Sequence, residues 1–373
     1  MIYLDYQATT PLAPEVTSNM RPWIVERFGN PHSPHRMGRE AAAAIEVARQ
    51  DVAALIGAGP EGKLHFTSGA TESANWALKG AAALLPAGRR RLVTLAPEHA
   101  AVLDSMQWLQ RFGYEVEVVP VQPSGLVDLD RLRSAIDERT GLVAAMLVNN
   151  EIGVVQPVRE IGRLARDAGA LFFCDAVQGA GRVDLPIDAC DMVALSSHKI
   201  HGPKGVGALW VREGVSLDSF MHGGGQEGGL RSGTLAPSLC VGFAAAARLM
   251  IERRDEDAAH VEGLWAAARE RMADWTLNGS EEQRYRGNLN IRRENVDSAR
   301  LISEVRAVAF SAGSACASGS GRASHVLAAL GLEGREARSS IRLGFGRYTE
   351  EQDLLEALDL IDGAAARQRS FAE

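Results

Sequence analysis

Residues 142–174 read LVAAMLVNNEIGVVQPVREIGRLARDAGALFFC, and this stretch decides the fold. The apolar run 142–148 predicts a buried strand, residues 158–168 predict an amphipathic helix, and residues 170–174 predict a second buried strand. Strands that are apolar on both faces and are joined through a helix are typical of neighbouring parallel strands. The stretch therefore predicts an α/β fold around a mostly parallel sheet.

The same alternation of helix and strand extends from about residue 38 to residue 211. Further strands are expected at residues 64–66, 91–95, 115–119, 192–195 and 207–211. Further helices are expected at residues 38–57, from residue 71 onward, and at residues 99–112 and 129–136. Ligands of such sheets bind beyond the carboxyl ends of the strands, so the polar residues that follow each apolar run are the first candidates for a site.

A chain of 373 residues suits one large domain and one smaller domain. We expect residues 15–250 to form the large domain, and residues 1–14 together with 251–373 to form a smaller α+β domain. A glycine-rich stretch at residues 223–233 interrupts the alternation, and an alanine-rich helix at about 241–254 is expected to link the two domains.

The composition, with 46% hydrophobic and 23% charged residues, is typical of a soluble globular protein. A net charge of −7 gives no reason to expect a nucleic-acid partner. No apolar run approaches the ~20 residues that span a membrane, and the first residues do not resemble a signal peptide. The four cysteines have neither metal-ligand nor disulfide spacing, which favours reduced thiols and a cytoplasmic location.

Polar residues gather directly after the expected strands. They are, in chain order, Ser68, Thr71, Asn150, Asp175, Gln178, Ser196, His198 and Lys199. A carboxylate or a lysine at the mouth of a buried strand is costly unless it meets an opposite charge. Burial would also lower the pKa of the Lys199 amine and suit it to bond with an aldehyde.

One ligand would explain these residues together. Pyridoxal 5′-phosphate carries an aldehyde for Lys199, a pyridine nitrogen for Asp175, and a phosphate for the free N–H groups where a helix begins near Thr71. The residues alone leave a second interpretation equally open. In it, Asp175 and Lys199 pair only with each other, and residues 68–73 only cap a helix.

Cys316 lies in the run SAGSACASGSG at residues 311–321, and these small, polar surroundings predict an exposed, mobile loop. Cys174, Cys190 and Cys240 are expected to be buried and inert, so Cys316 alone has the setting of an accessible nucleophile. Arg342 follows residues with strand character and could bind a carboxylate through two hydrogen bonds, although a surface arginine is the commoner case.

Eight short motifs occur in one order along nearly the whole chain. They are SGATES at 68–73, EH at 98–99, NNEIG at 149–153, SHKIHGPKG at 197–205, HGGGQE at 222–227, RSGT at 231–234, GSAC at 313–316 and SSIR at 339–342. Together they resemble the motifs of the NifS/IscS cysteine desulfurases. The resemblance implies the fold-type I, aspartate-aminotransferase-like architecture of PLP-dependent transferases, the class V aminotransferase group, and a homodimer.

The resemblance also implies which residues bind the cofactor. They are Ala70, Thr71, His99, Asp175, Gln178, Ser196, His198, Lys199 and, from the partner subunit, Thr234. Lys199 would bond to the cofactor, His99 would stack on its ring, Asp175 would hold the ring nitrogen and Gln178 the phenolic oxygen. Thr71, Ser196 and His198 would bind the phosphate, together with Thr234 of the partner subunit.

For the substrate, the resemblance implies that Asn150 and Arg342 bind its carboxylate, and that Cys316 acts with Lys199 and His99 in catalysis. The implied reaction converts L-cysteine to L-alanine and leaves a persulfide on Cys316 for a sulfur acceptor such as an iron–sulfur cluster scaffold. The alternatives are a selenocysteine lyase or another PLP enzyme of the class V group. The chain departs from the family at Gly228, where an arginine is frequent.

Overall fold

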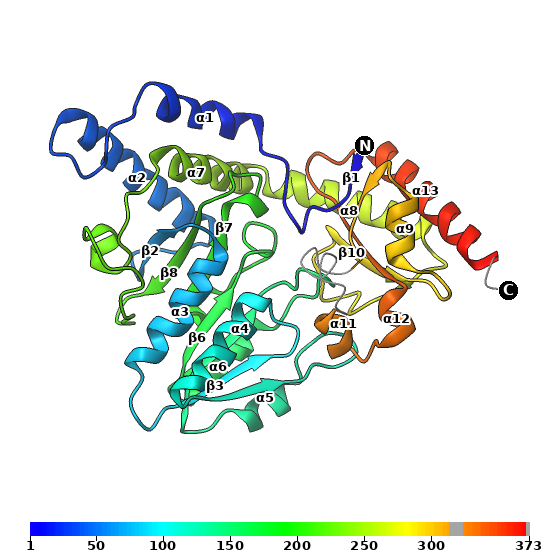
Figure 1. Ribbon diagram of the computed structural model, residues 1–373, viewed down its shortest axis with the longest axis horizontal. Coiled ribbons are helices and arrows are strands. Elements are labelled where there is room, and N and C mark those ends of the chain that lie inside the picture. The colour runs from blue at the N-terminus through cyan, green and yellow to red at the C-terminus, as the bar shows by residue number, and fades with distance from the viewer. Residues whose placement is uncertain (313–323, 371–373) are drawn as a thin grey trace.

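The computed structural model describes residues 1–312 and 324–370 (Figure 1). Its main sheet has the strand order β2-β8-β7-β6-β5-β3-β4. The bounds are β2 (Gly62–Thr67), β3 (Arg91–Leu95), β4 (Glu115–Val119), β5 (Thr140–Met146), β6 (Leu171–Asp175), β7 (Met192–Ser196) and β8 (Gly207–Arg212). Strand β8 runs opposite to the other strands of this sheet and pairs antiparallel with both β2 and β7. The predicted mostly parallel α/β sheet is confirmed.

Helices cover both faces of the main sheet. The apolar cluster on one face contains residues of α1 (Pro14–Val25), α2 (Arg36–Leu55), α5 (Leu129–Ala135), α6 (Val158–Asp167) and α7 (Pro237–Glu252). The cluster on the other face contains residues of α3 (Ala70–Leu84) and α4 (Ala100–Leu109). Within β6, Phe172 packs into the first cluster and Phe173 into the second, which explains why the strand is apolar up to its last residue, Asp175.

A second, smaller sheet has the order β12-β10-β9 and lies in the C-terminal part of the chain. Its strands are β9 (Thr276–Leu277), β10 (Asn288–Arg292) and β12 (Ser340–Gly344). The helices of this part are α8 (Arg254–Arg271), α9 (Ser298–Glu304), α11 (His325–Ala329), α12 (Gly334–Arg338) and α13 (Glu351–Ser370). The N-terminal strand β1 (Ile2–Tyr3) pairs with β11 (Val308–Ala309), so the chain begins beside this smaller sheet (Figure 1).

Two helices differ from the expectation. The alanine-rich helix α7 begins at Pro237 rather than near residue 241, because a proline suits the first helical position, where its missing N–H costs nothing. Helix α1 was not expected, and it contains Pro22 in its interior, a residue that usually ends helices. Among the described residues, no helix is both long enough and apolar enough to cross a membrane.

Candidate active site

A cavity of about 460 Å³ lies at the carboxyl ends of β5, β6 and β7. Its walls combine these strand ends with the first turn of α3, the N-terminal residues Gln7 and Ala8, and β12. Most of the residues singled out in the sequence line it: Ala70, Thr71, His99, Asn150, Asp175, Gln178, Ser196, His198, Lys199 and Arg342. The chain thus brings residues from six separate segments to one edge of the main sheet, where a ligand of such a sheet is expected.

Lys199 ends a short 3-10 turn that directly follows β7. Its Nζ donates hydrogen bonds to the carbonyl oxygens of Gln7 and, over 2.8 Å, of Ala8. Burial lowers the pKa of this amine to about 8, and the positive charges of Arg342 and Arg182 act in the same direction. The neutral, nucleophilic form of the amine is therefore reachable near physiological pH.

Asp175 is the last residue of β6 and is buried at the same edge. Its Oδ1 accepts a hydrogen bond of 3.0 Å from the backbone N–H of Val177. Burial raises the pKa of this carboxyl, and the nearby His99 and Lys199 offset only part of the rise. Lys199 and Asp175 form no ion pair within the described residues, so the interpretation in which they serve only each other is wrong.

His99 caps the start of α4, where its Nδ1 accepts a hydrogen bond of 3.1 Å from the N–H of Ala101. A neutral ring in this arrangement carries its proton on Nε2. The preceding Glu98 is fully buried, and its Oε1 accepts from the N–H of Met146 over 2.7 Å. Burial holds the pKa of Glu98 well above its usual range, which favours the protonated form of this carboxyl.

The anion-binding features of the cavity gather at the start of α3 and at the end of β7. Ala70 and Thr71 open α3, whose first N–H groups have no partner within the helix. His198 Nδ1 lies 3.1 Å from Thr9 Oγ1, and burial followed by the charge of Lys199 lowers the pKa of His198 to about 4. His198 is therefore neutral at physiological pH and acts through hydrogen bonding.

Arg342 lies in β12 and is only 1% exposed. Its Nη2 donates to Asp5 Oδ1 over 2.6 Å and to Ser311 Oγ over 3.3 Å, and its Nη1 donates to the carbonyl of Asn150 over 3.1 Å. The surface position that is commoner for an arginine is thereby excluded. The guanidinium is held by Asp5, a partner that the sequence did not suggest, and its Nε has no partner among the described residues.

Two of the predicted site residues are not found at the active-site cavity in the described part of the chain. Thr234 is exposed and does not line the cavity. Cys316 lies outside the described residues. The residues on either side of this gap nevertheless contact the site, because Ser311 bonds to Asp5 and Arg342, and His325 Nε2 lies 2.8 Å from the carbonyl oxygen of Glu98.

Several residues of the cavity were missed in the sequence. They are Gln7, Ala8, Glu151, Lys204 and His325, and the buried Glu98 lies next to the cavity residue His99. The acid Glu98 directly precedes the histidine of a quoted motif and follows a buried strand, a signal that could have identified it. The nearness of Gln7 to Lys199 joins positions 192 residues apart and left no local signal.

The comparisons with known proteins agree with this geometry. The family model described as "Aminotransferase class-V" matches residues 2–357. The chain is 44% identical over 369 residues to "Cysteine desulfurase IscS" of Rickettsia bellii (strain OSU 85-389), a match that covers 96% of this chain and 90% of the relative. The chain belongs to the class V aminotransferase family and, within it, to the NifS/IscS cysteine desulfurases.

Solved structures of the family are similar over almost the whole length. A structure titled "NIFS-LIKE PROTEIN" matches with a TM-score of 0.91 and 34% identity, over 98% of this chain and 99% of the other. A second, "SspA in complex with cysteine", matches with a TM-score of 0.83 and 35% identity, over 94% of this chain and 100% of the other. The fold-type I architecture expected from the motifs is confirmed.

Proposed function

We propose that this protein is a PLP-dependent cysteine desulfurase that converts L-cysteine to L-alanine and keeps the sulfur as a persulfide on Cys316. The observation that carries the proposal is the pair Lys199 and Asp175. Asp175 is buried and Lys199 is partly buried at one edge of the sheet in a chain of the NifS/IscS family, and each is left without the other as a partner.

The residues of the cavity fit pyridoxal phosphate. The pKa of Lys199 is lowered to about 8 by burial, which suits its amine to the aldehyde, and the carboxyl of Asp175 suits the ring nitrogen. We assign Gln178 to the phenolic oxygen and His99 to the face of the ring. The phosphate would be held by Ala70, Thr71, Ser196, His198 and Thr234 of the partner subunit. When bound, PLP supplies an electron sink at the α-carbon of an amino acid.

The chain's own groups carry the proton transfers and bind the substrate. Lys199 can accept the α-proton of the substrate in its neutral form, and His99, with a proton on Nε2, can donate one. Arg342 and Asn150 would bind the substrate carboxylate. Asp5 fixes one edge of the Arg342 guanidinium.

The sulfur step needs Cys316 as a thiolate, because the thiol is a poor nucleophile. A bond forms between Cys316 Sγ and the substrate sulfur while the bond from that sulfur to the substrate β-carbon breaks. The carbon fragment keeps the electron pair, takes up a proton and leaves as alanine, so one thiol and one cysteine give one persulfide and one alanine. Ser311 and His325 flank the segment that carries Cys316, and both contact the site.

The arrangement of domains and the partners belong to the same proposal. Residues 15–250 would form the cofactor-binding domain, and residues 1–14 with 251–373 the smaller domain. Two copies would form a homodimer, in which the exposed Thr234 reaches the partner's cavity. The persulfide would pass to a sulfur acceptor such as an iron–sulfur scaffold in the cytoplasm.

The variant Cys316→Ala tests the proposal. It should keep the visible absorbance band of the bound cofactor and lose the release of sulfide and alanine from cysteine, because only the sulfur acceptor is removed. Cys240→Ala is the matched control and should keep both, since Cys240 is buried and burial raises its pKa to about 12. Full desulfurase activity in Cys316→Ala would contradict the proposal.

A further inference from the structure

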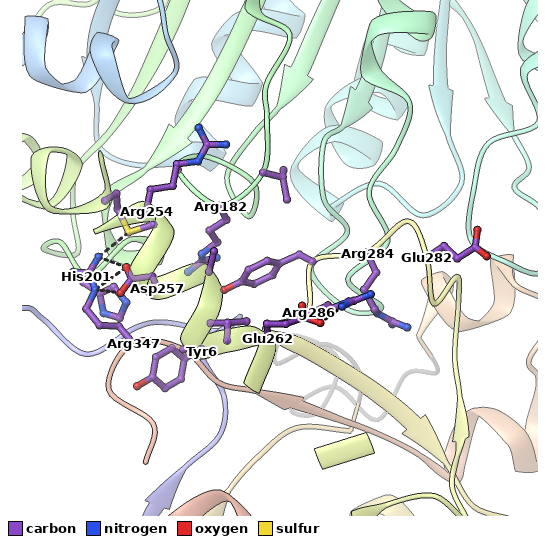
Figure 2. A pocket seen from close by; sticks show the side chains of 17 residues that line it. Tyr6, Arg182, His201, Arg254, Asp257, Glu262, Glu282, Arg284, Arg286 and Arg347 are labelled. Atoms are coloured by element: carbon purple, nitrogen blue, oxygen red, sulfur yellow. Dashed lines mark hydrogen bonds and ion pairs between the residues drawn. The ribbon is translucent and has the colours of Figure 1, made fainter. Parts of the chain in front are cut away.

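A second cavity of about 330 Å³ lies on the other side of the Lys199 segment and shares no lining residue with the active-site cavity. We call it the rear cavity. Its walls come from the segment after β6, from the start of α8, and from the residues around β10 and β12 of the smaller sheet (Figure 2). It therefore lies where the smaller sheet and its helices meet the main sheet.

The charges of the rear cavity do not balance. Its charged residues are Arg182, Arg254, Arg284, Arg286 and Arg347 on the positive side and Asp257, Glu262 and Glu282 on the negative side. Five arginines against three acidic residues leave two positive charges in excess. His201 adds none, because burial lowers its pKa to about 3.

The excess is located at two particular arginines. Arg347 pairs with Asp257 and Arg286 pairs with Glu262 inside the cavity, whereas Arg254 pairs with Asp184, which does not line it. Arg182 and Arg284 form no ion pair within residues 1–312 and 324–370, and each donates its hydrogen bonds to uncharged oxygens. In Figure 2, Arg182 lies toward one end of the cavity and Arg284 toward the other.

Arg284 is 7% exposed, so its charge is buried without a counter-ion among the described residues. Three backbone carbonyls, those of Ser280, Ile152 and Asn278, accept from its terminal nitrogens, and its Nε has no partner. A buried charge without an opposite charge is costly. An anion in the cavity would offset this cost.

Arg182 connects the rear cavity with the active site. Its Nη1 donates to the backbone carbonyl of Gln178 over 3.2 Å and to Gln178 Oε1 over 3.3 Å, and its Nη2 donates to the carbonyl of Lys199. The Arg182 guanidinium also lies 5.1 Å from the ring centroid of Tyr285. An anion that draws the guanidinium toward itself would therefore act on both active-site residues.

The remaining lining is apolar or aromatic and includes Met250, Val261, Tyr6 and Tyr285. A volume of about 330 Å³ suits a small organic molecule. We propose that the rear cavity binds a small organic dianion, a dicarboxylate or a phosphate monoester with an apolar body, whose anionic groups meet Arg182 and Arg284. Binding there changes the state of the active site through the contacts of Arg182 with Gln178 and Lys199.

Calorimetric titration of the holoenzyme tests the proposal, with isophthalate and phenyl phosphate as probes and neutral benzamide as the control ligand. At least one of the two dianions should bind with a Kd of about 1 mM or tighter, and benzamide should bind at least tenfold more weakly, a difference of about 1.4 kcal/mol. The stronger of the two dianions distinguishes a dicarboxylate from a phosphate ester. Saturating probe should also shift the visible absorbance band of the bound cofactor.

Two variants locate the binding. Arg182→Gln removes one of the unpaired charges and should weaken binding about tenfold, the usual order for a charge-assisted hydrogen bond. Ala258→Trp places a large side chain at the exposed mouth of the cavity without touching the active site, and should also abolish the shift of the absorbance band. The control Arg131→Gln removes an exposed arginine of α5 and should change nothing.

Equal affinities of isophthalate and benzamide, or an undiminished affinity in both Arg182→Gln and Ala258→Trp, would overturn the proposal. The second result would assign the probe to the active-site cavity, where Arg342 also lies. Failure to bind either dianion would overturn it as well. None of these outcomes depends on desulfurase activity, so they leave the proposed function untouched.

Discussion

Two clusters of charged side chains lie inside the molecule, and they differ in whether opposite charges are paired. Glu227, in the glycine-rich segment, accepts hydrogen bonds of 2.8 and 3.0 Å from Arg49 of α2, and His65 Nδ1 lies 3.2 Å away. Burial alone would raise the pKa of Glu227, but His65 and Arg49 outweigh it and hold the pKa below its usual range. Both Glu227 and Arg49 therefore stay charged and satisfy each other.

Asp175 is buried and Lys199 is partly buried, and the two are not paired with each other. Burial lowers the pKa of Lys199 to about 8 and raises that of Asp175, so both groups are pushed toward their neutral forms. A buried charge that is satisfied holds the fold together, whereas a buried charge that is left without a partner is available to a ligand. The difference separates a structural cluster from a functional one.

The largest effect is expected from Lys199→Ala. Removing the only amine proposed to bond to the cofactor should abolish the visible absorbance band and lower desulfurase activity by at least about 10³-fold. The exposed Lys204 lines the same cavity, and Lys204→Ala should keep the band. Spectra of the two purified variants, each with added PLP, make the comparison. A normal cofactor absorbance band in Lys199→Ala would show that Lys199 does not bond to the cofactor.

Glu227→Gln should act on stability instead. It leaves the half-buried Arg49 without its buried counter-charge and should lower the free energy of unfolding by roughly 3 kcal/mol. The control Glu46→Gln removes an exposed partner of the same arginine and should cost less than about 1 kcal/mol. Denaturant titration measures both, and equal stabilities of the two variants would erase the distinction between the clusters.

Asp175→Asn should separate activity from stability. The carboxyl is buried and its pKa is already raised, so a neutral amide of the same shape should leave the free energy of unfolding within about 1 kcal/mol of the parent. Activity should fall by about 10²-fold, because the ring nitrogen loses its acidic partner. Asp191→Asn serves as the control, since Asp191 accepts a hydrogen bond from the N–H of Phe172 and does not line the active-site cavity. A fully active Asp175→Asn would contradict the assignment.

The smallest effect concerns pH. The Lys199 amine must lose its proton before it can bond to an aldehyde, and its pKa of about 8 lies below the ordinary 10.5. The rate at which apoenzyme regains the cofactor band should therefore rise about fivefold from pH 7 to pH 8 and level off above pH 9, as the neutral fraction of the amine does. Stopped-flow absorbance measures this rate. A rate that keeps rising toward pH 10.5 would give Lys199 the pKa of an exposed lysine.

The sequence predicted the strands well where burial on both faces leaves a continuous apolar run. Phe172 and Phe173 of β6 pack into different clusters, so the strand is a continuous apolar run until it ends at Asp175. The sequence also predicted that Asp175 and Lys199 lie at the same edge of the sheet, because the carboxyl ends of neighbouring parallel strands lie side by side. Helix α1 was missed because Pro22 lies inside it.

Contacts between distant segments could not be predicted. Asp5 binds Arg342 across 337 positions, and Gln7 binds Lys199 across 192. Neither Asp5 nor Gln7 belongs to a periodic pattern, and each is recognisable as part of the site only once the N-terminal segment is seen between the two sheets. The hydrogen bond from Arg182 to the carbonyl of Lys199 could not be predicted either. Arg182 lines the rear cavity, whereas Asp175 and Gln178, which precede it in the chain, line the active-site cavity.

The central claim is that Lys199 serves a bound aldehyde rather than Asp175. Borohydride reduction of the holoenzyme makes the bond between PLP and its lysine permanent, and peptide mass mapping then identifies the modified residue. The account predicts the pyridoxyl phosphate mass on the peptide that contains Lys199 and on no other lysine. Modification of a different lysine, or of none in a preparation that shows the cofactor band, would contradict it.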